Sequence, residues 1–233
     1  MRFPLSWEID MILEVCTPNY QSAKNAYYAD AHRIELCEKL EVGGITPSYD
    51  LIKKVREILS IKTYVLVRPR SGNFVYDEDE FETMKADIQF CKKLGCDGIV
   101  SGVLNEDNTI DIARTRELIA LSKPLEFTFH RAFDDVVDPM ESMEQLIELG
   151  ADRILTSGQK ASAEEGIELL KLLKEKAKDR IVIMPGAGIN PDNAPLFKDL
   201  RFREIHASAS KHIDSELTSE VSTIKAILDA VQK

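Results

Sequence analysis

Two patterns of apolar and polar residues alternate along the whole chain. Short runs rich in Val, Ile and Leu are typical of strands buried in a parallel sheet. Between them, apolar residues recur at helical spacing and charged residues fill the other positions. The short runs predict strands at residues 11–16, 32–37, 62–68, 97–101, 125–131, 152–157, 181–184 and 203–206. The longer stretches predict helices at residues 18–29, 47–59, 78–94, 111–122, 138–149, 162–177, 191–199 and 215–231.

This regular succession of β–α units predicts an α/β protein that closes into a (β/α)8 barrel. The segments "ADAHRIEL", "LGCDGIVSG" and "LGADRILTSG" repeat one pattern, a helix end followed by a short polar turn and a strand. They lead into the second, fourth and sixth strands, which favours a closed symmetric barrel over an open doubly wound sheet. No linker divides the chain, so we expect one barrel domain over residues 11–233 and an N-terminal arm at residues 1–10.

The composition describes an acidic globular chain of 233 residues, of which 44% are hydrophobic. With 30 Lys and Arg against 40 Asp and Glu, the net charge is −10, so nucleic acid is not an expected partner. No apolar stretch reaches the length of a membrane-spanning helix, and we expect no membrane partner. The four cysteines lack zinc-type spacing, which favours reduced thiols in a cytoplasmic protein.

Polar residues gather where the predicted strands end, and this is the active face of such barrels. Alternation along each strand sends a set of charged side chains into the barrel: Glu14, Arg33, Glu35, Arg68, His130, Glu204 and His206. A buried carboxylate is costly unless it is paired. We expect Arg68 to be the partner, because a guanidinium matches a carboxylate with two hydrogen bonds. The alternative is an ionic layer that is purely structural.

Two cysteines, Cys16 and Cys37, end the first and second predicted strands. Neighbouring strands lie about 5 Å apart, so the two thiols could meet at the barrel mouth. A pair of thiolates suits a soft ion such as Cu(I). The alternative is that both are small buried apolar residues, which is common for free cysteine.

Small residues follow the last three strands, in "TSGQ", "PGAGI" and "HASAS". Ser157, Gly186 and Gly188 would give a phosphate or carboxylate close access to backbone N–H groups. The alternative is that these glycines only allow tight turns. Ala207, where a glycine often stands in phosphate-binding barrels, counts against phosphate.

His130 gives a third possibility, acid–base chemistry with nearby carboxylates. An imidazole beside Glu14, Glu35 or Asp134 has the groups that proton transfer needs. The alternative is a histidine that is satisfied within the core. The chain carries no P-loop, H-E-x-x-H, G-x-S-x-G or dinucleotide fingerprint that would specify another reaction.

Six motifs in order, "LEVC", "RIELC…GGITPS", "RPRSGNFVY", "FTFHRAFD", "LTSGQ" and "IVIMPGAGI", resemble the CutC family of copper homeostasis proteins. The resemblance runs from about Met11 to Ser208. It implies a TIM-type barrel, a cytosolic location, a link to copper tolerance, and a homodimer or higher homo-oligomer. It also implies that Cys16 and Cys37 bind Cu(I).

The matched motifs contain more polar groups than two thiols require, and they look like an enzyme pocket. In this second hypothesis the chain is a barrel enzyme that acts on a small anionic or phosphorylated metabolite, and copper is incidental. The candidate catalytic residues are Glu14, Glu35, Arg68 and His130, and the candidate anion-binding residues are Arg70, Ser157, Gly186 and Gly188. The expected ligand is therefore a copper ion or a small anion, and the sequence does not decide whether the protein is an enzyme.

Overall fold

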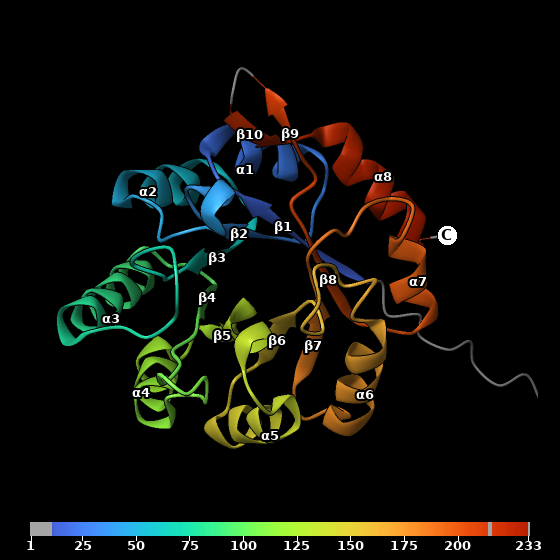
Figure 1. Cartoon of the computed structure of the whole chain (residues 1–233). Coiled ribbons are helices and arrows are strands. Elements are labelled where there is room, and N and C mark those ends of the chain that lie inside the picture. The colour runs from blue at the N-terminus through green and yellow to red at the C-terminus, as the bar shows by residue number, and fades with distance from the viewer. Residues whose placement is uncertain (1–10, 214–215, 233) are drawn as a thin grey trace, which may run out of the picture.

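The computed structural model describes residues 11–213 and 216–232, and the predicted arm at residues 1–10 lies outside this part. Parallel strands form the centre of the molecule, and helices surround them (Figure 1). The strand order is β7-β6-β5-β4-β3-β2-β1-β8, so neighbours in the chain are neighbours in the sheet and β1 pairs with β8. The predicted (β/α)8 barrel is confirmed.

The barrel strands are short, and each begins within two residues of its predicted first residue. Their bounds are β1 (Ile12–Thr17), β2 (Arg33–Leu36), β3 (Lys62–Leu66), β4 (Gly98–Ser101), β5 (Glu126–Phe129), β6 (Arg153–Thr156), β7 (Val182–Pro185) and β8 (Glu204–Ala207). Their apolar side chains face the helices and form the main core, as Leu13, Ile34 and Phe127 do with no exposed surface. This outward apolar face leaves the polar side chains of the same strands to fill the barrel interior.

The surrounding helices are α1 (Tyr20–Tyr28), α2 (Tyr49–Ile58), α3 (Glu78–Lys93), α4 (Ile112–Ser122), α5 (Pro139–Leu149), α6 (Ile167–Ala177), α7 (Ala194–Asp199) and α8 (Val221–Gln232). Local sequence explains several of their ends. Asp77 caps α3 in a capping box with Glu80, and Asp138 caps α5 just before Pro139. Gly150 ends α5 at a φ of 81°, a conformation that favours glycine. Within the described residues, no helix has the length and apolarity needed to cross a membrane.

The main difference from the sequence prediction lies before the last helix. A two-stranded antiparallel hairpin is formed by β9 (Ser210–Ile213) and β10 (Glu216–Ser219), and β10 occupies the start of the helix predicted at residues 215–231. The hairpin lies beside α1 in Figure 1, and α8 begins only at Val221. Two 3-10 helices, η1 (Leu40–Val42) and η2 (Arg131–Asp135), follow β2 and β5. All of these additions lie at the carboxyl ends of the strands, around the mouth of the barrel.

Candidate functional site at the barrel mouth

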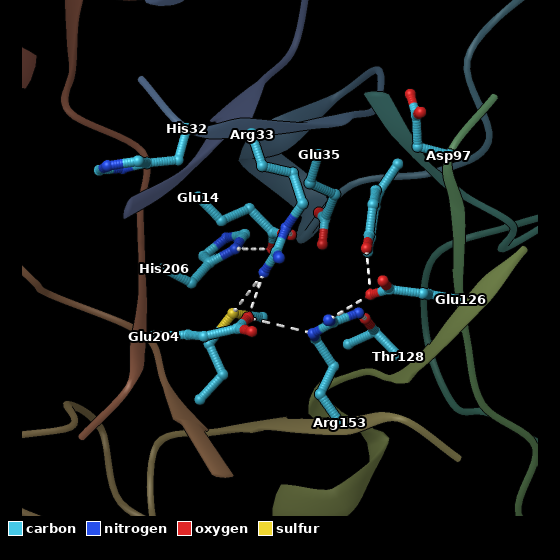
Figure 2. Close-up of polar contacts among 12 residues, drawn as sticks. Glu14, His32, Arg33, Glu35, Asp97, Glu126, Thr128, Arg153, Glu204 and His206 are labelled. Carbon is cyan, nitrogen blue, oxygen red and sulfur yellow. Dashed lines mark hydrogen bonds and ion pairs between the residues drawn. The ribbon is translucent and has the colours of Figure 1, made fainter. Parts of the chain in front are cut away.

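Alternating charges fill the barrel interior beneath the mouth (Figure 2). Arg33 donates from Nε to Glu14 at 2.5 Å and from Nη2 to Glu204. Arg153 donates from Nε to Glu204 at 3.1 Å and from Nη2 to Glu126 at 2.5 Å. The Glu126 side chain is 46% exposed, whereas the other four are 7% exposed or less. Together the five side chains tie β1, β2, β5, β6 and β8 in one ionic layer.

The neighbours of Glu14 keep it ionised. Burial alone would raise the pKa of Glu14, but Arg33 and then His206 lower it to about 2. The strand register explains the pair, because Glu14 and Arg33 stand opposite one another on β1 and β2. The expectation that Arg68 pairs with a buried glutamate was wrong. Arg68 comes two residues after β3 ends, whereas Arg33 and Arg153 belong to the strands themselves.

Arg68 instead binds the loops around the mouth. Its guanidinium donates from Nη1 to the Gly44 carbonyl at 2.9 Å and from Nη2 to the Gly72 carbonyl at 2.8 Å. The guanidinium carbon lies 4.8 Å from the centre of the Phe74 ring. Arg68 is buried, and its Nε has no hydrogen-bond partner within residues 11–213 and 216–232. The structure therefore places a buried cation beside the mouth, held by neutral carbonyl groups.

The two cysteines that end β1 and follow β2 meet as the sequence indicated. Cys16 Sγ lies 3.6 Å from Cys37 Sγ and 3.8 Å from Glu35 Oε1. Both thiols are free and buried. The hydrogen bond with Cys37, together with burial, raises the pKa of Cys16 well above its ordinary value. The pair is therefore a reduced dithiol that has to lose protons before it can bind a metal.

His206 and Glu35 complete the polar group around Cys16. The ligand atoms of Cys16, Glu35 and His206 all lie within 4.8 Å of one another. His206 Nδ1 is 2.8 Å from Glu14 Oε1 (Figure 2). Burial alone would lower the pKa of His206, but Glu35, Cys16 and Glu14 raise it well above its ordinary value. Burial raises the pKa of Glu35 to about 7.

This donor set fits a metal ion. Metal–sulfur bonds of about 2.3 Å allow two sulfurs 3.6 Å apart to share one ion. The imidazole of His206 and the carboxylate of Glu35 add nitrogen and oxygen donors on the same side. Glu35 Oε2 is buried without a hydrogen-bond partner among the residues that the structure describes, as expected of a group that awaits a ligand. The sequence analysis placed His206 inside the barrel but not among the site residues, although strand alternation alone indicated its direction.

His130 lies on the opposite side of the mouth, at the start of η2. Its Nδ1 accepts a hydrogen bond from the Ala132 backbone N–H at 3.2 Å, and its ring centre lies 4.8 Å from that of Phe74. Burial and then the positive charge of Arg68 lower the pKa of His130 to about 3. The neutral ring that accepts at Nδ1 must carry its proton on Nε2. That Nε2 is buried and has no hydrogen-bond partner in the described part of the chain.

A cavity of about 340 Å³ joins these two sides of the mouth. Its polar lining comes from both sides and includes Cys16, Glu35, Arg68, His130, Arg131 and His206. Its apolar lining includes Leu40, Leu66, Phe74, Leu155 and Leu217. Gly188, with a φ of 75°, brings backbone to the edge of the same cavity. The cavity is therefore lined on one side by the possible metal ligands Cys16, Glu35 and His206, and on the other side by Arg68 and His130.

Other predicted site residues lie elsewhere among the described residues. Arg70 binds Glu80 at 2.6 Å and several carbonyls of its own loop. Thr156 and Ser157 donate hydrogen bonds to Asp134, and the described residues show no hydrogen bond between Asp134 and His130. Glu14 belongs to the ionic layer. The predicted acid–base group is therefore not assembled as proposed, and of its carboxylates only Glu35 shares the cavity with His130.

Gly186 follows β7 and packs against Leu155 and His206 at the carboxyl ends of the strands. A Cβ at this position would lie 2.5 Å from Leu155 Cδ1 and 3.3 Å from His206 Cβ, so the glycine permits close packing of β7. Gly186 does not contribute to the described lining of the cavity, and neither do Arg70 and Ser157. The anion-binding roles of these three residues stay predictions.

The fold and the mouth define a (β/α)8 barrel protein with a buried thiol pair at the carboxyl ends of its first two strands. The model of the CutC family matches residues 11–211. The chain therefore belongs to the CutC family, as the sequence motifs indicated.

Individual relatives agree with this assignment. The chain is 45% identical to the human copper homeostasis protein cutC homolog over 214 residues, which is 91% of this chain and 78% of that protein. It is also 45% identical to the family protein CutC of Histophilus somni (strain 2336), covering 91% of this chain and 88% of the relative. The crystal structure of a putative copper homeostasis protein CutC from Streptococcus agalactiae aligns with a TM-score of 0.81 and 34% identity, covering 85% of this chain and 98% of that one.

More distant structures share the fold alone. A thiamine phosphate pyrophosphorylase from Pyrococcus furiosus aligns with a TM-score of 0.64 at 18% identity, covering 96% of each chain. This likeness confirms the barrel architecture and carries no information on the reaction or ligand of the present protein.

Proposed function

We propose that this protein binds Cu(I) through Cys16 and Cys37 and takes part in copper homeostasis. The observation that carries the proposal is the separation of 3.6 Å between the two buried sulfurs at the barrel mouth. Soft thiolate ligands favour Cu(I) over the harder ions that carboxylates prefer. The naming of the human and mouse relatives as copper homeostasis proteins supports the same ion.

The surrounding residues would assist the thiol pair in different ways. His206 and Glu35 reach the same space and could complete the coordination, whereas Glu14 holds His206 by its Nδ1. The raised pKa of Cys16 means that Cu(I) has to displace a thiol proton. Copper affinity should therefore fall as the solution becomes more acidic. The cytoplasmic location and the homo-oligomer stay predictions.

A titration with Cu(I) tests the proposal. Reduced, metal-free protein competes with a chromophoric Cu(I) chelator, and the Cys16→Ser/Cys37→Ser variant is measured beside it. We expect one Cu(I) per wild-type chain. We also expect the double variant to lose roughly 100-fold or more in affinity, since even groups outside the ligand shell contribute 10–100-fold.

The chain offers a matched control. Cys91 and Cys96 form a second buried pair of cysteines, joined by a hydrogen bond from the Cys96 backbone N–H to the Cys91 carbonyl at 3.1 Å. They lie in the main core, away from the mouth cavity. The Cys91→Ser/Cys96→Ser variant should retain the wild-type affinity and stoichiometry. If this variant loses the copper, or if the Cys16→Ser/Cys37→Ser variant keeps it, the assignment of the site is wrong.

A further inference from the structure

Arg68 carries a buried positive charge that no described carboxylate neutralises in an ion pair. Its guanidinium contacts the carbonyls of Val42, Gly44 and Gly72 and the face of Phe74. Neutral carbonyls satisfy its N–H groups but leave its net charge, and burying an unpaired charge is costly. Its Nε lacks a hydrogen-bond partner in the part of the chain that the structure describes. A ligand that brings a negative charge into the cavity would neutralise it.

His130 supplies a second donor on the wall of the same cavity. The Ala132 N–H occupies Nδ1 at 3.2 Å, so the proton of the neutral ring is on Nε2. Buried N–H groups without a partner are rare in folded proteins and point to a missing ligand or water. His130 is 5% exposed and lines the cavity, and its Nε2 has no partner among the described residues. Both side chains pack against Phe74, which holds the two donors at a fixed spacing.

The other groups of the cavity limit what such a ligand is. Arg131 is paired with Asp134 at 2.7 Å, and the acidic Glu35 lies beside His206, whereas Arg68 has no ion-pair partner among the described residues. Leucine and phenylalanine side chains form much of the remaining wall. A volume of about 340 Å³ is at the small end of the usual range for ligand sites.

We propose that this cavity binds a small organic carboxylate with an apolar body, whose carboxylate is held by Arg68 and by the Nε2–H of His130. The apolar body lies against the side chains of Leu66, Phe74 and Leu155. This ligand is additional to copper and does not depend on the thiol pair, because Arg68 and His130 contribute nothing to the metal-type donor set.

Nuclear magnetic resonance of the full chain labelled with ¹⁵N tests the proposal directly. The probes are benzoate and 4-methylpentanoate, and the controls are the neutral amides of the same acids. The ¹⁵N resonance of His130 Nε2 is assigned by its loss in His130→Gln. We expect both carboxylates to shift this resonance and both amides to leave it in place. The Cys16→Ser/Cys37→Ser variant should show the same shift, which separates this proposal from the copper site.

Isothermal titration calorimetry with the carboxylate that binds more tightly then measures how much Arg68 contributes to the binding affinity. Arg68→Gln should weaken binding by at least roughly tenfold, because a charge-assisted hydrogen bond is lost. Arg68→Lys, which keeps the charge, should bind with intermediate affinity. Arg180→Gln removes a surface arginine that pairs with Glu144 on the outside of the barrel, and it should bind as the wild type does.

Several outcomes would overturn the proposal. These are equal binding of acid and amide, carboxylate binding that leaves His130 Nε2 unshifted, and the absence of a shift with either acid. A shift produced by inorganic phosphate but not by the carboxylates would also reject the assigned class of ligand. The wild-type measurements decide these points even if the Arg68 variants fail to fold.

Discussion

His130 is a buried imidazole whose charge state links folding to pH. Its pKa is about 3 in the folded protein, where burial and then Arg68 disfavour the charged ring, against an ordinary value of 6.5. Between these two values the unfolded chain binds a proton that the folded protein does not bind. His130 therefore lowers the free energy of unfolding progressively as the pH falls from 6.5 towards 3.

The substitution His130→Gln should remove this part of the acid sensitivity. In the window between pH 6.5 and 3, we expect the slope of unfolding free energy against pH to decrease by up to about 1.4 kcal/mol per pH unit. Urea unfolding at a series of pH values measures both slopes. His212→Gln, which removes an exposed imidazole on β9, is the control for the loss of an imidazole. Parallel curves for wild type and His130→Gln would contradict the buried neutral state.

Sequence alternation predicted the direction of individual side chains better than their partners. Glu14, Glu35 and His206 all lie inside the barrel as expected, because a strand fixes which face each residue occupies. The partner of Glu14 depends on the register between neighbouring strands, and the sequence alone does not give this register. Arg33 was predicted to point inward without being assigned a partner, and Arg153 was absent from the predicted interior.

At the scale of elements, α1 and the hairpin show how distant segments complete one another. Asn19 and Asn25 donate from their side-chain amides to the carbonyls of Leu217 at 3.1 Å and Ser219 at 2.8 Å. Ser22 accepts from the Ser219 backbone N–H at 3.1 Å. Side chains of α1 and its N-cap thus form hydrogen bonds with the backbone groups on one edge of β10. These contacts hold Leu217 where it lines the mouth cavity.

The contact predicts a local effect when Asn25 is changed to alanine. We expect the free energy of unfolding to fall by about 1 kcal/mol, because the Ser219 carbonyl loses a partly buried hydrogen-bond partner. Hydrogen exchange should become faster over residues 216–219 and stay unchanged in β3 to β6. Lys24→Ala, a neighbouring change on α1, is the control and should leave exchange in β10 as in the wild type. Faster exchange spread evenly over the barrel would refute the local role.

The same contacts explain why most elements could be predicted and the hairpin could not. The eight barrel strands follow from local runs of apolar residues, which the sequence displays directly. The hairpin is polar, and its stability depends on side chains of α1 that precede it by almost 200 residues. A helical reading of residues 215–231 fitted the local spacing, but tertiary contacts place Glu216–Ser219 in β10.

At the scale of the whole molecule, the ionic layer divides the barrel into two regions with different roles. Below the mouth, alternating carboxylates and guanidinium groups neutralise one another across five strands. Above the layer, Arg68 and the unpaired atoms of Glu35 and His130 leave polar groups available to ligands. Such contrast between satisfied and unsatisfied buried groups is typical of a site built on a rigid scaffold.

Glu204 is the centre of this layer, because its carboxylate accepts from both Arg33 and Arg153. We expect Glu204→Gln to lower the free energy of unfolding by about 3 kcal/mol, since it leaves two buried guanidinium groups short of negative charge. Glu126→Gln, at the end of the same layer where the side chain is 46% exposed, should cost less than about 1 kcal/mol. Urea unfolding of both variants at neutral pH measures the difference.

A double-mutant cycle shows whether the layer acts as one unit. The single variants are Glu204→Gln and Arg153→Met, and the double variant carries both changes. If Glu204 mainly neutralises Arg153, the double variant should lose much less unfolding free energy than the sum of the two single losses. If the two losses simply add, the carboxylate and guanidinium are independent and the layer does not bind the strands together. Strong coupling would instead mean that β6 and β8 are joined through side chains inside the barrel. The ionic layer would then be one connected network beneath the mouth. This network would fix the position of the thiol pair relative to the mouth cavity.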